Sequence, residues 1–212
     1  MAVWKTLNYA EEEEKEIRIN LHKTLTKHEQ RTILSEAAIN SILPWHFEKG
    51  EAYHVLSLGD IDSLTFFRLI LKEQKVEYAL ISTWKISRMD IEEIGTWLEA
   101  GNVGRIDFYI GEILQSAFKS DFAMLTEICK KHNCRLVSLK NHSKIICAFG
   151  EKYNVVVESS ANMNTNPRIE QTTITIDDEL AKFYKKNFDS LLPLNKDYKQ
   201  PPKYELRLRK NG

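Results

Sequence analysis

Polar residues between positions 142 and 170 have the types and the spacing of a site that handles phosphate. His142 and Lys144 are two residues apart at the start of a predicted strand, so both side chains are expected on one face. A lysine ammonium suits the non-bridging oxygens of a phosphate, and a histidine can act as nucleophile or as general acid and base near neutral pH. On its own, the H-x-K pair also fits an unrelated pair of surface residues.

A second polar group follows a strongly apolar predicted strand. Ser160 and Asn162 are again two residues apart, and they offer a hydroxyl and an amide to a phosphate. Glu170 opens the next predicted strand and is expected to take the Nδ1 proton of a histidine, which would fix the tautomer and the direction of the ring. The glycine-rich phosphate motifs do not occur in the sequence, so any phosphate would be held by side chains.

The order H-S-K, strand, S-S-A-N and downstream glutamate resembles the half-site of the phospholipase D superfamily. That signature is H-x-K-x-x-x-x-D, followed by a G-S-x-N type stretch and a later acidic residue, and the resemblance spans about residues 50 to 190. It implies that His142 is the nucleophile and that Glu170 orients its imidazole. The residues that it implies for binding the phosphate are Lys144, Ser160 and Asn162.

Two positions depart from the family pattern. Phe149 stands where the family has its aspartate, five residues after Lys144, and Ser159 stands where it has glycine. The loss of the aspartate motivates an alternative from a different functional class. In that alternative the chain is a catalytically inactive binding or scaffold protein that keeps the phospholipase D-like fold.

The sequence contains one such motif, whereas two motifs form one site in the superfamily. The resemblance therefore implies a homodimer in which the two copies of His142 face each other across the axis. It also implies a metal-independent phosphodiesterase that works through a phosphohistidine intermediate, with no cofactor and no metal.

Nucleic acid is the expected substrate, because the short single-motif members lean toward nucleases. Local charge agrees, since residues 134–168 contain five Lys or Arg against two Glu. A second alternative is a hydrolase of lipids or small phosphodiesters, which would share the same half-site. Two more residues are candidates for contacting the substrate: Trp84, which could stack on a base or cover the core, and Arg168, which could contact a phosphate or be solvated.

Alternating strand and helix patterns predict an α/β fold, with a mixed β-sheet flanked by helices on both faces. The sheet is expected to be mostly parallel at first and antiparallel later. Strands are expected at residues 52–58, 76–83, 105–111, 134–140, 143–150, 153–161 and 170–176. Helices are expected at 62–74, 87–101, 120–133 and 177–192, and the expected caps are Asp62 or Ser63, Ser87, Ser120 or Asp121, and Asp177 or Asp178, with Gly101 as a stop.

The sequence divides into a helical N-terminal extension at 1–48, an α/β domain at 49–194 and a basic tail at 195–212 that is expected to be flexible. The helical pattern at 10–43, which Pro44 is expected to end, is interpreted as lying outside the core, at a dimer interface or a partner site. Net charge is zero, three cysteines lack a paired spacing, and neither a leader nor a membrane-spanning run is apparent. These features predict a cytoplasmic protein without membrane contact.

Overall fold

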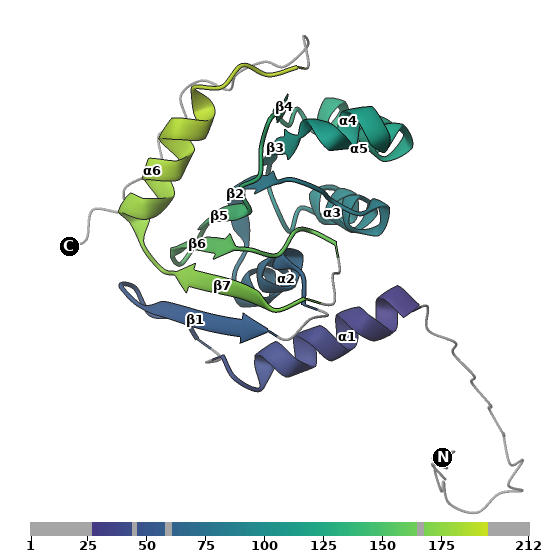
Figure 1. Ribbon diagram of the computed structural model, residues 1–212. Helices are drawn as coiled ribbons and strands as arrows, with labels where there is room; N and C mark the ends of the chain where they lie inside the picture. Colours follow the sequence, from purple (N-terminus) through teal and green to yellow (C-terminus); the bar gives the residue numbers. More distant parts are fainter. Residues whose placement is uncertain (1–26, 44–45, 58–60, 165–167, 195–212) are drawn as a thin grey trace, which may run out of the picture.

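Seven strands form one mixed sheet in the order β1-β7-β6-β5-β2-β3-β4 (Figure 1). The computed structural model describes residues 27–43, 46–57, 61–164 and 168–194. The strands β2, β3 and β4 pair in parallel, and every other pairing is antiparallel. Strand bounds are β1 Ala52–Ser57, β2 Val76–Thr83, β3 Ile106–Gly111, β4 Leu136–Leu139, β5 Ile145–Gly150, β6 Asn154–Ser159 and β7 Glu170–Thr175.

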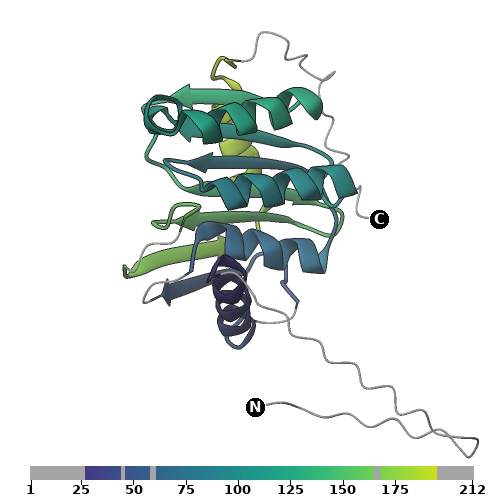
Figure 2. The same cartoon turned by 90° about the vertical axis from the view of Figure 1, so that its right-hand side faces the viewer.

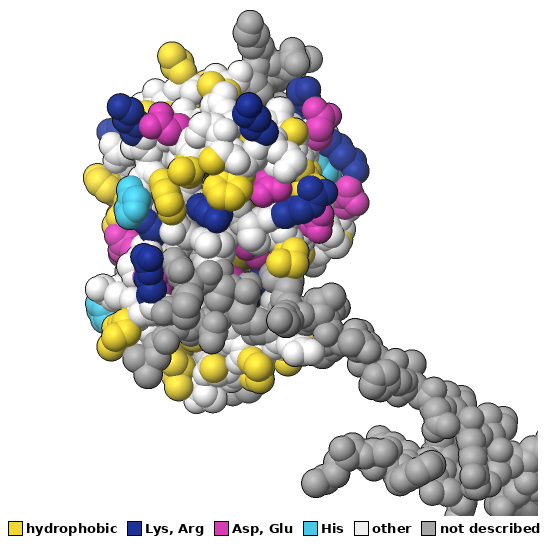
Figure 3. Space-filling view, turned by 45° about the vertical axis from the view of Figure 1, so that its right-hand side comes forward, with side chains coloured by type: hydrophobic (Ala, Val, Ile, Leu, Met, Phe, Trp, Pro, Cys, Tyr) yellow, Lys and Arg dark blue, Asp and Glu magenta, His cyan; other side chains and the backbone are white. Residues whose placement is uncertain are grey.

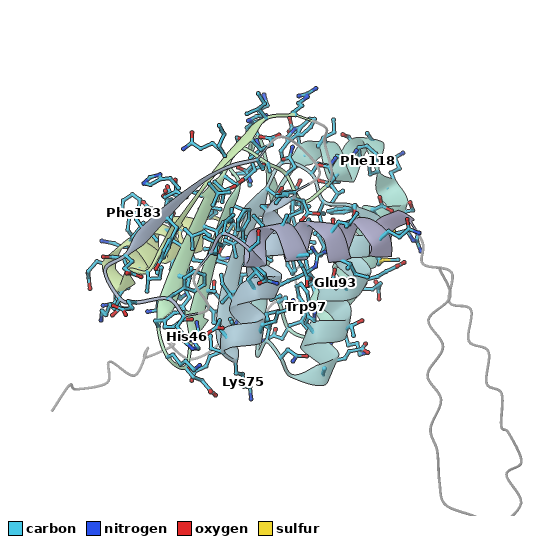
Figure 4. All side chains as sticks on the ribbon, turned by 90° about the horizontal axis from the view of Figure 1, so that it is seen from below. His46, Lys75, Glu93, Trp97, Phe118 and Phe183 are labelled. Carbon is cyan, nitrogen blue, oxygen red and sulfur yellow. The ribbon has the colours of Figure 1, made fainter. Side chains whose placement is uncertain are left out.

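Helices cover both faces of this sheet, which confirms the predicted fold class. The helices α2, α3 and α5 lie on one face, and among the described helices α6 is the one on the opposite face (Figures 1 and 2). Figure 4 shows the two sides through Trp97 of α3 and Phe183 of α6, which lie on opposite sides of the sheet. Helix bounds are α1 Lys27–Asn40, α2 Ser63–Glu73, α3 Arg88–Ala100, α4 Glu112–Ala117, α5 Lys119–Lys131 and α6 Asp178–Asp189.

Helix ends follow the sequence where a capping side chain is present. The N-caps of α2, α3 and α6 are Asp62, Ser87 and Asp177, and each accepts a hydrogen bond from the backbone N–H three residues on. Gly101 ends α3 with a φ of 73°, a left-handed conformation that glycine adopts without steric cost. These four predicted helix ends are confirmed.

The predicted start of α5 at Ser120 or Asp121 is wrong. A short helix that was not predicted, α4, directly precedes α5, and Phe118 joins the two. The Phe118 N–H donates to the carbonyl of Leu114 at 3.1 Å, and its own carbonyl accepts from Phe122 N–H at 3.0 Å. Because the preceding turn of helix occupies this junction, α5 begins without a side-chain cap.

The N-terminal helical pattern is described only in part, because residues 10–26 and Pro44 lie outside the described residues. Within the described part, α1 packs against α2, and Ile39 is 1% exposed in the main core cluster. The prediction that this helix lies outside the core is therefore wrong. Ile33 and Leu34 of α1, and Ile42 just after it, are exposed, so the helix buries one side only and its exposed side is also partly apolar.

The core has two parts, one on each face of the sheet. The larger part lies between the sheet and α2, α3 and α5, while the smaller part lies under α6 and includes Tyr78, Tyr109 and Phe149. The buried carboxylate of Asp107 accepts from Arg105 at 2.8 Å and from the backbone N–H of Arg135 at 2.8 Å. This pairing offsets the cost of burying a charge beneath α6.

A buried ion-pair cluster joins α2 to α3. Arg68 donates to Glu93 at 2.7 and 2.9 Å and to Asp90 at 3.3 Å, and it lies 3.6 Å from Asp62 (Glu93 is labelled in Figure 4). Burial, and then the nearby charge of Asp62, raises the pKa of Asp90 to about 7, although Ser87 and Arg68 oppose the shift. The cluster therefore holds three carboxyls around one guanidinium, and Asp90 is the one that gains a proton near neutral pH.

We expect Asp90→Asn to change how stability depends on pH. The raised pKa means that the folded protein binds a proton that the unfolded chain has lost, so the contribution of Asp90 to stability is most favourable below about pH 4 and falls as the pH rises toward 7. The free energy of unfolding of the variant minus that of the parent should increase by on the order of 2 kcal/mol from pH 5 to pH 8, because one pKa unit is worth about 1.4 kcal/mol.

Urea unfolding at the two pH values measures this difference. Glu92→Gln is the matched control, since Glu92 lies on the same helix with its side chain 52% exposed and paired only with Arg88. An equal pH dependence of the two variants would contradict the role given to Asp90.

Candidate functional site

The predicted site residues lie together at one edge of the sheet, by which we mean the side where the strands begin or end and not an outer strand. The strands β2, β3, β4 and β6 end at this edge, and β5 and β7 begin there. His142 and Lys144 precede β5, Ser160 follows β6, Glu170 is the first residue of β7, and Trp84 follows β2. This end of the sheet therefore collects a histidine and an ammonium from the β4–β5 connection, and a hydroxyl and a carboxylate from the β6–β7 connection.

A turn rather than a strand brings His142 and Lys144 together. The strand β5 begins at Ile145, so the predicted strand position of His142-Ser143-Lys144 is wrong. The Lys144 side chain instead folds back, and its Nζ donates to the backbone carbonyl of His142 at 2.6 Å. The alternation of side chains along a strand therefore does not explain why the two groups meet.

The Lys144 ammonium lies over the face of the His142 imidazole. Its Nζ is 3.0 Å from Nδ1 and 3.5 Å from Nε2. A donor in line with the lone pair of one ring nitrogen would be much farther from the other, so the ammonium lies above the ring. The side chain of His142 is exposed, so its ring is accessible from solvent.

Lys144 is largely buried at this exposed edge. It is 7% exposed, and burial lowers the pKa of its ammonium while the charge of Glu170 opposes that shift. The cation is thus only partly desolvated, and a nearby carboxylate stabilises it. Such an ammonium attracts an anion more strongly than a fully hydrated lysine does.

Glu170 is hydrogen-bonded to Ser160 and not to the imidazole. The Ser160 hydroxyl donates to the Glu170 carboxylate and accepts from the backbone N–H of Gln171 at 3.0 Å. Ser159, at the position of the family glycine, accepts from Ala161 N–H at 3.0 Å and so forms part of the turn. In the described part of the chain, the ring of His142 contacts Lys144 and Trp84.

The loop that carries Asn162 is held by the beginnings of two helices. The backbone carbonyl of Asn162 accepts from Ser63 N–H at 3.4 Å, and the carbonyl of Met163 accepts from Ser87 N–H at 2.8 Å. The amide oxygen of Asn162 is buried and has no hydrogen-bond partner among the residues described. The structure therefore does not place this amide against Lys144.

Of the two candidates for substrate contact, Trp84 lies at the site. Its ring centroid is 5.8 Å from that of His142, with an angle of 46° between the planes. A Cβ at Gly111 would come within 2.5 Å of the Trp84 carbonyl, so the close approach of β3 at this point requires glycine. Arg168 is exposed between β6 and β7 and makes no hydrogen bond or ion pair within the described ranges.

Asn141 is a residue of this edge that the sequence analysis did not identify. It is 9% exposed, and its side chain bonds to Ser82, Ser143 and the Tyr109 carbonyl. The available signal was its position directly before the H-x-K pair, since asparagine often hydrogen-bonds a neighbouring backbone in turns. The sequence does not reveal that this asparagine reaches the ends of two other strands.

A shallow pocket of about 350 Å³ adjoins the site. It is lined by Glu158, Ser159, Ser160, Gln171 and Thr173, all at the ends of β6 and β7. Within the described ranges, no group of three or more His, Cys, Asp or Glu side chains is arranged to hold a metal ion. None of the described helices has the length and apolar character needed to cross a bilayer.

No protein-family model matches the sequence, and no curated protein sequence matches it. Solved structures similar to the chain include the polyphosphate kinase from Porphyromonas gingivalis, with a TM-score of 0.50 and 13% identity over 66% of this chain and 26% of that protein. They also include TrmBL2, an archaeal chromatin protein, with a TM-score of 0.48 and 13% identity over 77% of this chain and 58% of that protein. A third is the phosphatidylserine synthase of Haemophilus influenzae Rd KW20, with a TM-score of 0.47 and 14% identity over 66% of this chain and 37% of that protein. At 13% identity the likeness to the polyphosphate kinase shows a shared fold over the matched part alone, and this chain spans about a quarter of that protein's length.

Proposed function

We propose that the protein is a metal-independent phosphodiesterase of the phospholipase D superfamily, a nuclease whose site is shared across a homodimer. The observation that carries this proposal is the contact between Lys144 and His142. A buried ammonium lies 3.0 Å from an exposed imidazole, at the edge where Ser160 and Glu170 also lie. A buried positive charge and an exposed imidazole are thus adjacent, which supports roles for them as anion-binding group and nucleophile.

In the proposed mechanism, a ring nitrogen of His142 attacks the phosphorus and forms a P–N bond. The bond from phosphorus to the leaving oxygen breaks, and His142 of the second copy gives that oxygen a proton. Water then attacks the phosphorus and gives its proton to that second histidine, while the P–N bond breaks and releases the product. Each histidine thus returns to its starting protonation state.

Lys144 supplies the positive charge for this reaction. The ammonium neutralises charge that gathers on the non-bridging oxygens in the transition state, and it is most effective where water is excluded. Ser160 and Asn162 are the proposed polar partners of the phosphate, and Asn162 would have to turn its amide toward the ligand. Glu170 holds the lysine in its charged form and fixes the Ser160 hydroxyl.

Nucleic acid is the proposed substrate, and the attraction for it would be local. The chain has no net charge, and acidic and basic side chains are interspersed over the face in Figure 3. Of the five basic residues at 134–168, Lys140, Lys144 and Arg168 lie in the connections at this end of the sheet, whereas Arg135 and Lys152 lie at the opposite end of the strands. Trp84 lies beside His142, where a base could stack.

The alternative of an inactive binding protein depends on Phe149. This side chain is 2% exposed and packs on Tyr78, with 5.5 Å between ring centroids, in the core under α6. Five residues along a strand separate it from Lys144 by roughly 17 Å. At that distance the phenylalanine serves packing and cannot touch a phosphate at the sheet edge, which favours retained chemistry.

We expect the protein to cleave single- or double-stranded DNA or RNA in excess EDTA, and His142→Ala to lower the rate by more than about a thousandfold, because the nucleophile is removed. Gel analysis of labelled oligonucleotides measures the rate. His46→Ala is the matched control, since His46 is 84% exposed and paired with Glu73 away from the site.

A folded parent that cleaves no nucleic acid would sink the nuclease assignment. Turnover of bis(4-nitrophenyl) phosphate or of phospholipid vesicles by the same sample would then support a hydrolase of small phosphodiesters or of lipids. Inactivity on all of these substrates would favour the binding protein.

We expect mixed dimers to reveal the shared site. When parent and His142→Ala chains are co-expressed in equal amounts, about a quarter of the dimers contain two parent chains and therefore both copies of His142. Activity should then fall to about a quarter of the all-parent value. A self-contained site in each chain would instead leave about half. Analytical ultracentrifugation establishes the dimer in the same samples, and a monomer would contradict this part of the proposal.

We expect Glu170→Gln to shift the alkaline limb of the pH–rate profile to lower pH. Burial lowers the pKa of Lys144 and Glu170 counteracts this, so removing the carboxylate lets the ammonium lose its proton earlier as the pH rises. The profile of kcat/KM from pH 6 to pH 10 measures the shift. Glu151→Gln, an exposed change at the opposite edge of the sheet, should leave the limb in place.

A further inference from the structure

The connection from β4 to β5 has to cross the ends of two other strands. The strand β4 is an outer strand of the sheet and pairs with β3, whereas β5 pairs with β2. The chain between Leu139 and Ile145 therefore passes over the ends of β3 and β2 before it can enter β5. The candidate nucleophile and its lysine both lie in this crossing segment.

Asn141 attaches the crossing segment to both strands. Its amide Nδ2 donates to the Ser82 hydroxyl at the end of β2 and to the Tyr109 carbonyl of β3, each at 2.8 Å. Its Oδ1 accepts from the backbone N–H of Ser143 at 2.9 Å and from the Ser143 hydroxyl at 2.7 Å. The side chain is 9% exposed, and every polar group on it is bonded.

Two of these contacts, together with one between Ser82 and Ser143, close a ring of hydrogen bonds. Asn141 donates to the Ser82 hydroxyl, which lies 2.6 Å from the Ser143 hydroxyl, and the Ser143 hydroxyl donates back to the Asn141 carbonyl oxygen. A closed ring in which each member both donates and accepts is strengthened by mutual polarisation. It immobilises residues 141 and 143, which flank His142 and precede Lys144.

We propose that Asn141 is the positioning residue of the phosphodiesterase site, because it fixes the turn that places the Lys144 ammonium over the His142 ring. The effect of Asn141 on catalysis rests on the proposed function. The turn itself is a structural claim that can be tested without activity. The turn has two further ties to the sheet, since the backbone N–H of Ser159 donates to the Lys144 carbonyl at 2.9 Å and the Ser143 hydroxyl lies 2.6 Å from that of Ser82. Asn141 is the side chain that bonds to β2, to β3 and to the turn at once.

Three variants separate anchoring from other effects. Asn141→Asp keeps the shape and the acceptor but loses both donors, and Asn141→Ala removes the whole side chain. Ser82→Ala removes the anchor on β2 without adding charge and leaves the bond to Tyr109 intact. Gln74→Glu is the matched control, because this buried amide also bonds to backbone groups, those of residues 152 and 153, but at the opposite edge of the sheet.

The first measurement is lysine acetylation by an activated ester, read residue by residue with mass spectrometry on full-length folded protein. Lys144 is 7% exposed, so its labelling should rise about fivefold or more in both Asn141 variants as the turn opens, and less in Ser82→Ala. Lys130, with a side chain 50% exposed, serves as the internal reference. The Gln74→Glu protein should label Lys144 as the parent does.

The second measurement is kcat and KM on an oligonucleotide, at a temperature where every variant is fully folded. We expect the two Asn141 variants to lose about 10- to 100-fold in kcat, since small misplacements of a reacting group cost that much, and Gln74→Glu to keep the parent kcat. Unchanged labelling of Lys144 in Asn141→Ala, or an equal loss of kcat in Gln74→Glu, would overturn the inference. If the parent cleaves nothing while the labelling still rises, the turn is confirmed and only the proposed function fails.

Discussion

The antiparallel pairing of β5 with β2 makes the candidate site possible. It reverses the direction of the chain in the middle of the sheet, so that the entry to β5 lies between the exits from β2 and β6, with the exit from β3 one strand farther away. The side chains of one short turn can then approach those of three other connections. Had β5 paired with β4, the histidine and the lysine would lie at an outer edge, away from Ser160 and Glu170.

Much of the fold could be predicted because local signals and packing agree. The strands are short and apolar, and Asp62, Ser87 and Asp177 stand where helices need an N-terminal acceptor. What could not be predicted depends on distant partners. The pairing of β1 with β7, the insertion of α4 before α5 and the burial of Ile39 follow from how the elements assemble. No local pattern encodes these contacts.

The candidate site was predicted as a set of residues and only partly as a geometry. The types and spacing of His142, Lys144, Ser160 and Glu170 were enough to bring them to one edge of the predicted sheet. The sequence did not show that Lys144 would fold back over the ring, or that Ser160 would hold Glu170, because a side-chain direction in a turn is set by its hydrogen bonds. The role of Asn141 was hidden for the same reason, since its partners are 59 and 32 residues away.

The N–H of Ser63, the first residue of α2, and that of Ser87, the N-cap of α3, donate to the carbonyls of Asn162 and Met163. Helix starts that could have cradled an anion are thereby committed to holding a loop. At the candidate site the polar groups left to meet a ligand are therefore side chains, each encoded by a single codon. Such a site can be retuned or silenced by one substitution while the scaffold stays intact, so descendants of one ancestor could diverge between enzyme and binding protein without any change of fold.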